Sequence, residues 1–227
     1  MKILAFDVFG TVVDWYGSIV REVAQLGLDV DPGQFALDWR AGYQPAMARV
    51  RSGELGWTRI DDLHRMILDD LLVKYRIEMD EPARRALNLV WHRLRPWPDA
   101  VEGLTRLKSR FTITTLSNGN ISLLTEMAKR AGLPWDCILS AEVFRHYKPD
   151  PETYLGVCRL FEIDPEDMML VAAHKDDLDA ARALGCRTAF VERPHEFGPN
   201  QTRDLRREPR FDFHARNFQD LADQLSC

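Results

Sequence analysis

The fold is decided by the stretch Lys2-Ile3-Leu4-Ala5-Phe6-Asp7-Val8-Phe9-Gly10-Thr11. Its apolar run predicts a buried β-strand that carries one acid, Asp7, at its end. A buried carboxylate is costly unless a neighbouring group uses or neutralises it. Because ligands of open α/β sheets bind beyond the carboxyl ends of the strands, Asp7 stands where a nucleophile would be mounted. Taken alone, it could equally be an acid that caps a turn.

Short apolar runs of the same kind recur along the chain, and segments of helical period separate them. The strand-like runs are 2–6, 111–116, 168–172 and 187–191, and the main helical segments between them are 98–109, 119–131, 151–161 and 176–184. This alternation predicts an α/β protein with a doubly wound, mainly parallel sheet, a Rossmann-like core. Phe211 and Phe213, followed by the helix-like segment 217–226, could add an edge strand and a covering helix.

Residues 16–95 break this rhythm with several helical patterns and no convincing strand. We therefore predict two domains, a core of residues 1–15 and 96–227 and an inserted helical cap of residues 16–95. Trp97-Pro98-Asp99 marks the return to the core, with Asp99 expected to cap the next helix. An insertion at this point would overhang the carboxyl edge of the sheet and could close over a ligand.

Composition is that of a globular protein that can bury one core and a smaller second unit. The 227 residues include 30 Lys and Arg against 35 Asp and Glu, a net charge of −5, which argues against a nucleic-acid partner. The arginine-rich stretch 203–210 is interrupted by acids and predicts a solvated loop. The spacing of the four cysteines indicates neither a disulfide framework nor a metal site. With no signal peptide and no apolar run of membrane-spanning length, a soluble cytoplasmic protein is expected.

Four polar clusters follow the predicted core strands. They are Asp7 with Thr11, Ser117-Asn118-Gly119, Lys148 within Tyr147-Lys148-Pro149-Asp150, and His174-Lys175-Asp176-Asp177. One such cluster is weak support for a site. Since the carboxyl ends of parallel strands meet at one edge of a sheet, four clusters in sequence order strongly predict a common site there.

With these motifs and the helical insertion, the chain resembles the haloacid dehalogenase superfamily, and within it the 2-haloacid dehalogenase (type II) branch. The superfamily's phosphatases keep a general acid two residues after the nucleophile and a magnesium ligand four residues before the last acid. Here those positions hold Phe9 and Ala173. Phenylalanine transfers no proton, and the loss of a carboxylate leaves a poor magnesium site. A halide leaves as an anion and needs neither, so the resemblance favours the dehalogenase branch without cofactor or metal.

The resemblance implies a catalytic role for each of five residues. Asp7 would attack the carbon that bears the halogen, with Lys148 holding it ionised; at about 4 Å and an effective dielectric near 20 their attraction is about 4 kcal/mol before desolvation. Thr11 offers a hydroxyl beside Asp7. Asp177 occupies the position of the acid retained by the branch as a base for ester hydrolysis. His174 could orient or deprotonate the water, because an unperturbed histidine has a pKa near 6.5, or it could be a buried structural histidine.

A second group of residues is expected to bind the substrate and the halide. Arg40 in the cap would receive the halide, and Asn118 would donate its amide to it. Ser117 with nearby backbone amides would bind the substrate carboxylate, with Tyr154 close by. Phe9 is also expected to contact the substrate.

The expected function is therefore hydrolysis of short 2-haloalkanoic acids to 2-hydroxyalkanoic acids through an aspartyl ester, with inversion at C2. Two alternatives stay open at this point, a magnesium-dependent small-molecule phosphatase and a non-catalytic small-acid binding protein. The resemblance also implies a possible homodimer. The sequence leaves undecided which halogen and chain length are preferred, whether fluoroacetate is a substrate, and the physiological substrate.

Overall fold

The computed structural model describes residues 2–200 and 204–227, and its centre is a six-stranded parallel sheet. The strand order is β5-β4-β1-β6-β7-β8, so β1 lies in the middle with β4 on one side and β6 on the other. Its strands are β1 (Ile3–Phe6), β4 (Thr112–Ser117), β5 (Cys137–Ser140), β6 (Met168–Ala172), β7 (Arg187–Val191) and β8 (Phe213–Ala215). The predicted doubly wound parallel sheet is confirmed, and the loops after β1, β4 and β6 meet at its centre.

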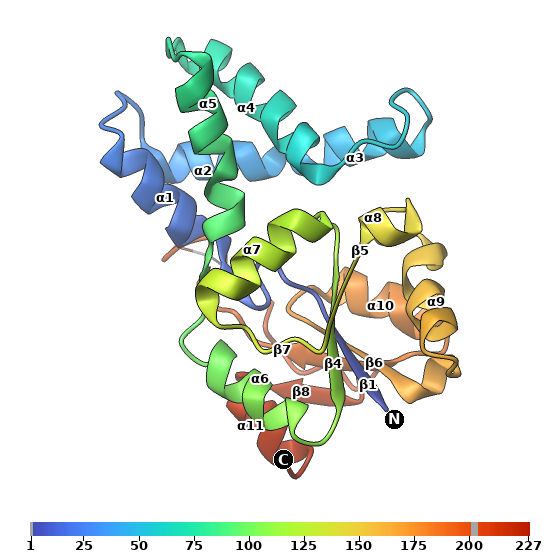
Figure 1. Cartoon of the computed structure of the whole chain (residues 1–227). Coiled ribbons are helices and arrows are strands. Elements are labelled where there is room, and N and C mark those ends of the chain that lie inside the picture. Colours follow the sequence, from blue (N-terminus) through green and yellow to red (C-terminus); the bar gives the residue numbers. More distant parts are fainter. Residues whose placement is uncertain (1, 201–203) are drawn as a thin grey trace.

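Alternating side chains of the central strands divide the core between two faces of the sheet. Leu4 and Phe6 pack with one group of helices, whereas Ala5 faces the other group. In Figure 1 the first group appears as α6 and α11 beside α7, and the second as α9 and α10. Their bounds are α6 (Ala100–Lys108), α7 (Ile121–Ala131), α9 (Pro151–Leu160), α10 (Lys175–Ala183) and α11 (Phe218–Gln224); the short α8 (Ala141–Phe144) and the 3-10 turn η2 (Pro165–Asp167) complete this region. Both faces of the sheet are thus covered, as parallel sheets require.

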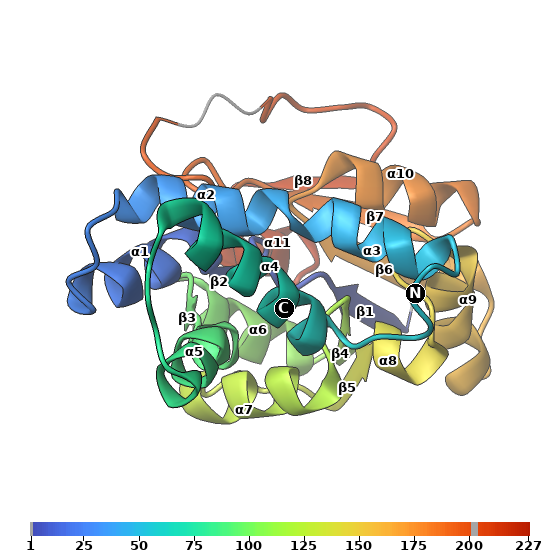
Figure 2. The ribbon, with the colours of Figure 1, turned by 90° about the horizontal axis from the view of Figure 1, so that it is seen from above.

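A separate set of helices lies over the carboxyl edge of the sheet, and we call it the cap. It contains α1 (Trp15–Gln25), α2 (Pro32–Ala41), α3 (Tyr43–Arg51), α4 (Ile60–Tyr75), α5 (Glu81–Asn88) and the 3-10 turn η1 (Leu89–Arg93). Seen from above in Figure 2, α2 and α3 cross over the sheet. The cap is joined to the core at a small antiparallel ladder of β2 (Val13–Asp14) with β3 (Arg95–Pro96).

Two strand features differ from the prediction. The edge strand β5 was missed because its four residues, Cys137–Ser140, form too short a run to stand out between two helical segments. It is fixed instead by register, since Thr115 Oγ1 lies 3.0 Å from the amide nitrogen of Leu139 and 2.7 Å from its carbonyl oxygen. The ladder of β2 with β3 was also missed, because its two partners lie far apart in the chain. Pairings of this kind leave little local periodicity to detect.

Asp99 directly precedes α6 as expected, but its side chain makes no capping hydrogen bond to that helix. Its carboxylate instead receives two hydrogen bonds from the guanidinium of Arg193, at 2.8 and 2.9 Å, and a third from the amide of Phe218. Of the arginine-rich stretch, residues 204–207 are irregular, and residue 203 lies outside the described residues. Within residues 2–200 and 204–227, none of the helices has the length and apolar character that crossing a membrane requires.

Candidate active site

Asp7 follows the central strand β1, at the point where the strand order reverses. It is 6% exposed, and its backbone amide still donates to the carbonyl of Val171 in β6 at 3.0 Å. The hydroxyl of Thr11 donates to Asp7 Oδ2 at 2.7 Å and accepts from the amide of Ala173 at 2.9 Å. Thr11 thereby ties the loop after β1 to the loop after β6 and orients the Asp7 carboxylate.

Lys148 lies between two carboxylates. Its ammonium nitrogen is 2.9 Å from Asp7 Oδ1 and also pairs with Asp177 Oδ2. Its backbone amide donates to Asn118 Oδ1 at 2.8 Å, which fixes the loop before α9 against the loop after β4. The Lys148 side chain is only 7% exposed, so water screens these ion pairs weakly.

The charges of this cluster reinforce one another. Burial by itself would raise the pKa of Asp7, but the positive charge of Lys148 and the hydrogen bond from His174 hold that pKa well below its usual range. Burial by itself would lower the pKa of Lys148, but Asp177 and Asp7 outweigh it and raise that pKa. At neutral pH Asp7 is therefore an anion and Lys148 a cation, the state that a carboxylate nucleophile needs.

Tyr154 was expected near the substrate, but in the structure it is a hydrogen-bond partner of Asp177. Tyr154, expected close to the substrate carboxylate, is fully buried and donates its hydroxyl to Asp177 Oδ1 at 2.5 Å. Among the described residues, Asp177 lines the pocket and Tyr154 does not. Burial and the negative charge of Asp7 raise the pKa of Asp177, although Lys148 opposes this shift. A carboxylate with a raised pKa is a stronger acceptor of a proton from water.

His174 bridges two carboxylates, and this geometry bears on its two expected roles. Its Nδ1 lies 3.0 Å from Asp7 Oδ2, and its Nε2 lies 2.8 Å from Glu196 Oε1. Burial lowers its pKa, but Glu196 and Asp7 outweigh burial and raise the pKa of His174 to about 10. Both ring nitrogens then carry protons at neutral pH. With both nitrogens facing carboxylates and protonated, the ring has no lone pair to accept a proton, so the geometry favours an orienting role for His174 over that of a base.

The ion cluster opens into a pocket of about 450 Å³ between the core and the cap. The cap contributes Leu37, Arg40, Ala41, Tyr43 and Gln44, and the core contributes Asp7, Phe9, Asn118, Lys148, Pro149, His174, Asp176, Asp177 and Phe197. Charged groups therefore gather on the core side, and the cap covers them with aromatic and aliphatic surface together with one cation. Such a pocket suits a small organic anion.

Arg40, at the end of α2, is the cap's cation at this pocket. Its guanidinium carbon lies 4.3 Å from the centre of the Tyr43 ring. The Nε atom of Arg40 is buried and, within the described part of the chain, has no hydrogen-bond partner. Tyr43 is only 5% exposed, and burial raises its pKa to about 12, so it faces the pocket as a neutral phenol. The guanidinium is thus left with bonding capacity for an anion.

Ser117 and Asn118 have different surroundings. Asn118 lines the pocket; its Oδ1 accepts from the Lys148 amide, and its Nδ2 lies 3.4 Å from the sulfur of Met47 in the cap. Ser117, expected to bind the substrate carboxylate, is fully buried, and its oxygen accepts from the amide of Gly119 at 3.1 Å. Among the residues that the structure describes, it does not line the pocket. This hydrogen bond shapes the turn that contains Asn118.

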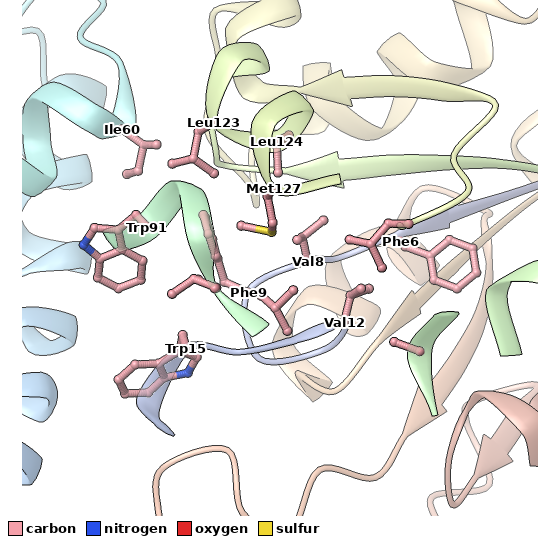
Figure 3. Close-up of a cluster of buried hydrophobic side chains, with 14 of the residues drawn as sticks. Phe6, Val8, Phe9, Val12, Trp15, Ile60, Trp91, Leu123, Leu124 and Met127 are labelled. Carbon is pink, nitrogen blue, oxygen red and sulfur yellow. The ribbon is translucent and has the colours of Figure 1, made fainter. Parts of the chain in front are cut away.

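Phe9 lies where the cap and the core share a hydrophobic cluster. Figure 3 shows it among Trp91 of the cap and Leu124 of α7, and its ring centre is 5.7 Å from that of Trp91 in a perpendicular arrangement. Phe9 also lines the pocket. The contact of Phe9 with substrate stays a prediction. In the structure Phe9 packs between the cap and the core.

The residues present do not fit a magnesium site. The Lys148 ammonium stands between Asp7 and Asp177, where a second positive ion would be repelled. Phe9 and Ala173 supply no oxygen ligand from their side chains, and magnesium needs near-octahedral oxygen coordination. Over the described ranges, no group of three or more His, Cys, Asp or Glu side chains is arranged to hold a metal ion.

Sequence reasoning missed Glu196 and Tyr43. Glu196 lies in the loop after β7, a strand that the sequence did predict, so the rule that polar residues beyond strand ends form the site would have found it. It is 1% exposed and also accepts from Trp15 Nε1 at 3.2 Å. Tyr43 carries no sequence signal for a functional role, because a tyrosine at the start of a cap helix ordinarily packs in the hydrophobic core.

The comparisons with known proteins agree with this geometry. Residues 1–185 match the family of haloacid dehalogenase-like hydrolases. The crystal structure of the L-2-haloacid dehalogenase PA0810 is similar at 46% identity, with a TM-score of 0.95 and coverage of 99% of both chains. That of the defluorinating L-2-haloacid dehalogenase Rha0230 is 45% identical, with a TM-score of 0.96 and coverage of 100% of this chain and 96% of that one. (S)-2-haloacid dehalogenase 4A of Burkholderia cepacia is 27% identical over 216 residues, 88% of each chain.

Proposed function

The chain belongs to the haloacid dehalogenase-like hydrolases, and from that premise we propose that it hydrolyses short 2-haloalkanoic acids to 2-hydroxyalkanoic acids. The names of its relatives support the L, or (S), enantiomers as substrates. Direct displacement at C2 then gives the opposite configuration in the product. The single observation that carries the proposal is the buried Asp7–Lys148–Asp177 cluster that lines the pocket without a metal site.

In the first step, Asp7 attacks C2 of the substrate. A new bond forms between an Asp7 oxygen and C2 while the carbon–halogen bond breaks, and the halogen leaves with the electron pair. Arg40 and the Asn118 amide, both at the pocket, supply the cation and the hydrogen-bond donor that a departing halide needs. Exclusion of water by the cap keeps the Asp7 carboxylate reactive.

In the second step, water hydrolyses the ester at Cγ of Asp7. Lys148 and His174 both carry their protons at neutral pH, so Asp177 is the group at the cluster that can accept the proton of the attacking water. The tetrahedral intermediate then collapses with cleavage of the bond between Cγ and the oxygen attached to C2. The product alkoxide takes up a proton, and Asp7 retains one oxygen from water. Overall, haloacid and water give hydroxyacid, halide and a proton.

A single turnover in ¹⁸O-labelled water tests the covalent step. With enzyme in excess, the first product should carry an unlabelled hydroxyl oxygen, and the label should appear in Asp7 by mass spectrometry. Label in the first product would overturn the ester mechanism. Asp7→Asn should abolish halide release, since the amide is a far poorer nucleophile.

A second measurement separates this proposal from magnesium-dependent phosphatase activity. Halide release should be unchanged by a chelator and by added magnesium, because the Lys148 ammonium already stands between the two carboxylates. Phosphate-ester hydrolysis that needs magnesium would favour the alternative. Binding of haloacids with no halide release would instead indicate a binding protein. A homodimer and a cytoplasmic location stay predictions, to be checked by light scattering and cell fractionation.

A further inference from the structure

Asp7, His174 and Glu196 form a hydrogen-bonded row from the nucleophile toward α1 of the cap. His174 Nδ1 lies 3.0 Å from Asp7 Oδ2, and His174 Nε2 lies 2.8 Å from Glu196 Oε1. Glu196 is held in turn by the indole nitrogen of Trp15 at 3.2 Å. Its carboxylate also lies against Gly10, where a Cβ atom would come within 2.2 Å of Oε1. The position of Glu196 is therefore tightly determined by the loop that carries Asp7.

The two oxygens of Asp7 differ in how many donors they receive. Oδ2 receives the Thr11 hydroxyl at 2.7 Å and His174 Nδ1 at 3.0 Å. Within the described residues, Oδ1 receives only the Lys148 ammonium, at 2.9 Å. Each carboxylate oxygen has two lone pairs in the plane of the group. Oδ1 thus keeps one lone pair for attack on carbon, and Oδ2 becomes the carbonyl oxygen of the ester.

We propose that His174 and Thr11 form the oxyanion site for Oδ2 of Asp7 during ester hydrolysis, and that Glu196 is the positioning residue that holds His174 in place for this role. This inference rests on the proposed function, since it assigns the groups that serve its second step. When water adds to Cγ, the electron pair of the C–Oδ2 double bond moves onto Oδ2. Donors already aimed at that oxygen stabilise the new charge without reorganisation.

The formation of the ester explains why Glu196 is needed. Once Oδ1 is bonded to C2, Asp7 has lost its negative charge, and His174 loses one of the two anions beside it. A buried imidazolium that faces a neutral ester would tend to release its proton. Glu196, on the other side of the ring, supplies the remaining negative charge next to it. His174 then remains a cation until the oxyanion forms.

The charged groups around His174 come from several elements. They are Asp7 after β1, Lys148 before α9, Asp176 and Asp177 on α10, Glu196 and Arg193 after β7, and Arg40 with the neutral phenol of Tyr43 from the cap. Lys148 engages Oδ1 and not Oδ2. His174 is accordingly the cation in direct contact with the oxygen on which negative charge develops.

The variant Glu196→Gln tests the inference by rapid-quench single turnovers. Halide release should stay within about 3-fold of wild type. Hydrolysis should slow by about 10- to 100-fold, less than the loss of about 10²- to 10³-fold that removal of a whole oxyanion donor causes. The Asp7 ester should then accumulate and be visible by intact-mass spectrometry. The fall in kcat at high pH should begin at lower pH than in wild type, because His174 loses its proton more easily.

Glu192→Gln is the matched control, since Glu192 lies in the same loop but pairs with His214 at 2.6 Å, away from the pocket. It should change neither step. Equal slowing of both steps by Glu196→Gln, or an unchanged pH profile, would show a merely structural role and overturn the inference.

A measurement on the wild-type protein covers the case in which Glu196→Gln does not fold. Nitrogen NMR of the histidine rings should find both nitrogens of His174 protonated at pH 8; a neutral ring would overturn the inference. Failure of the proposed function would look different, because wild type itself would then release no halide and form no Asp7 ester from any 2-haloacid.

Discussion

Arg51, at the end of cap helix α3, donates from its guanidinium to the main-chain carbonyl oxygen of Lys148 at 2.7 Å. The same guanidinium pairs with Asp150 at 3.3 Å. The cap is thus attached directly to the loop that presents the central cation of the site. The position of α3 and the placement of the Lys148 ammonium are thereby coupled through one side chain.

Arg51→Ala should weaken this coupling. We expect KM for 2-chloropropionate to rise about 10-fold, since a hydrogen bond from a charged group contributes about 1.5–3 kcal/mol. Arg49→Ala is the control, because Arg49 pairs with Glu54 on the surface of the cap, at 2.7 Å, and exposed pairs contribute little. Steady-state halide release measures both variants, and equal KM values for them would contradict the coupling.

Arg40→Met should impair departure of the halide. The variant keeps an aliphatic side chain but removes the cap cation at the pocket, so kcat/KM for halide release should fall by about 100-fold or more. Arg65→Met provides the comparison, since Arg65 belongs to a surface network with Asp69 and Glu81. A loss as large in Arg65→Met as in Arg40→Met would argue against a specific role for Arg40.

Tyr154→Phe should act on the base, Asp177. The Tyr154 hydroxyl lowers the pKa of Asp177, so its removal raises that pKa further. Less Asp177 is then ionised in mild acid, so the acidic limb of the kcat profile should move to higher pH, and kcat should fall more at about pH 5 than at about pH 8. Tyr75→Phe, which removes a similar hydrogen bond to Asp38 in the cap, should leave the profile unchanged.

His174 should also leave a signature in the pH dependence of stability. Its pKa is raised from 6.5 to about 10 on folding, so between these values the folded state binds more protons than the unfolded state. The stabilisation by His174 is therefore complete below about pH 6.5 and is lost as pH rises to about 10. Urea unfolding of wild type and His174→Asn should give a free-energy difference that shrinks across this window. A constant difference would contradict the assignment.

The sequence predicted the fold through local patterns. The runs that became β1 and β6 are continuously apolar, because parallel strands covered on both faces bury both sets of side chains. Those that became β4 and β7 mix apolar residues with threonine, a residue common in strands. The strand β5 escaped because four residues give too little pattern, and only its pairing with β4 fixes it. Asp99 lost its expected capping role for a related reason, since a distant partner, Arg193, binds its carboxylate.

In the site, too, local patterns predicted some features and distant partners decided others. Sequence by itself predicted that Asp7 and Asp177 belong to one site, because each follows a predicted strand at one edge of a parallel sheet. Lys148 was assigned to the same site from its Tyr147-Lys148-Pro149 context and the family resemblance, since β5, the strand before it, was missed. Tertiary structure alone decided the protonation of His174 and the partner of Tyr154, which depend on Glu196 and Asp177, 22 and 23 residues away in the chain. The physical reason is that periodicity is a local property of the chain. A pKa or a hydrogen-bond partner is set instead by charges and burial that exist only once remote loops have come together.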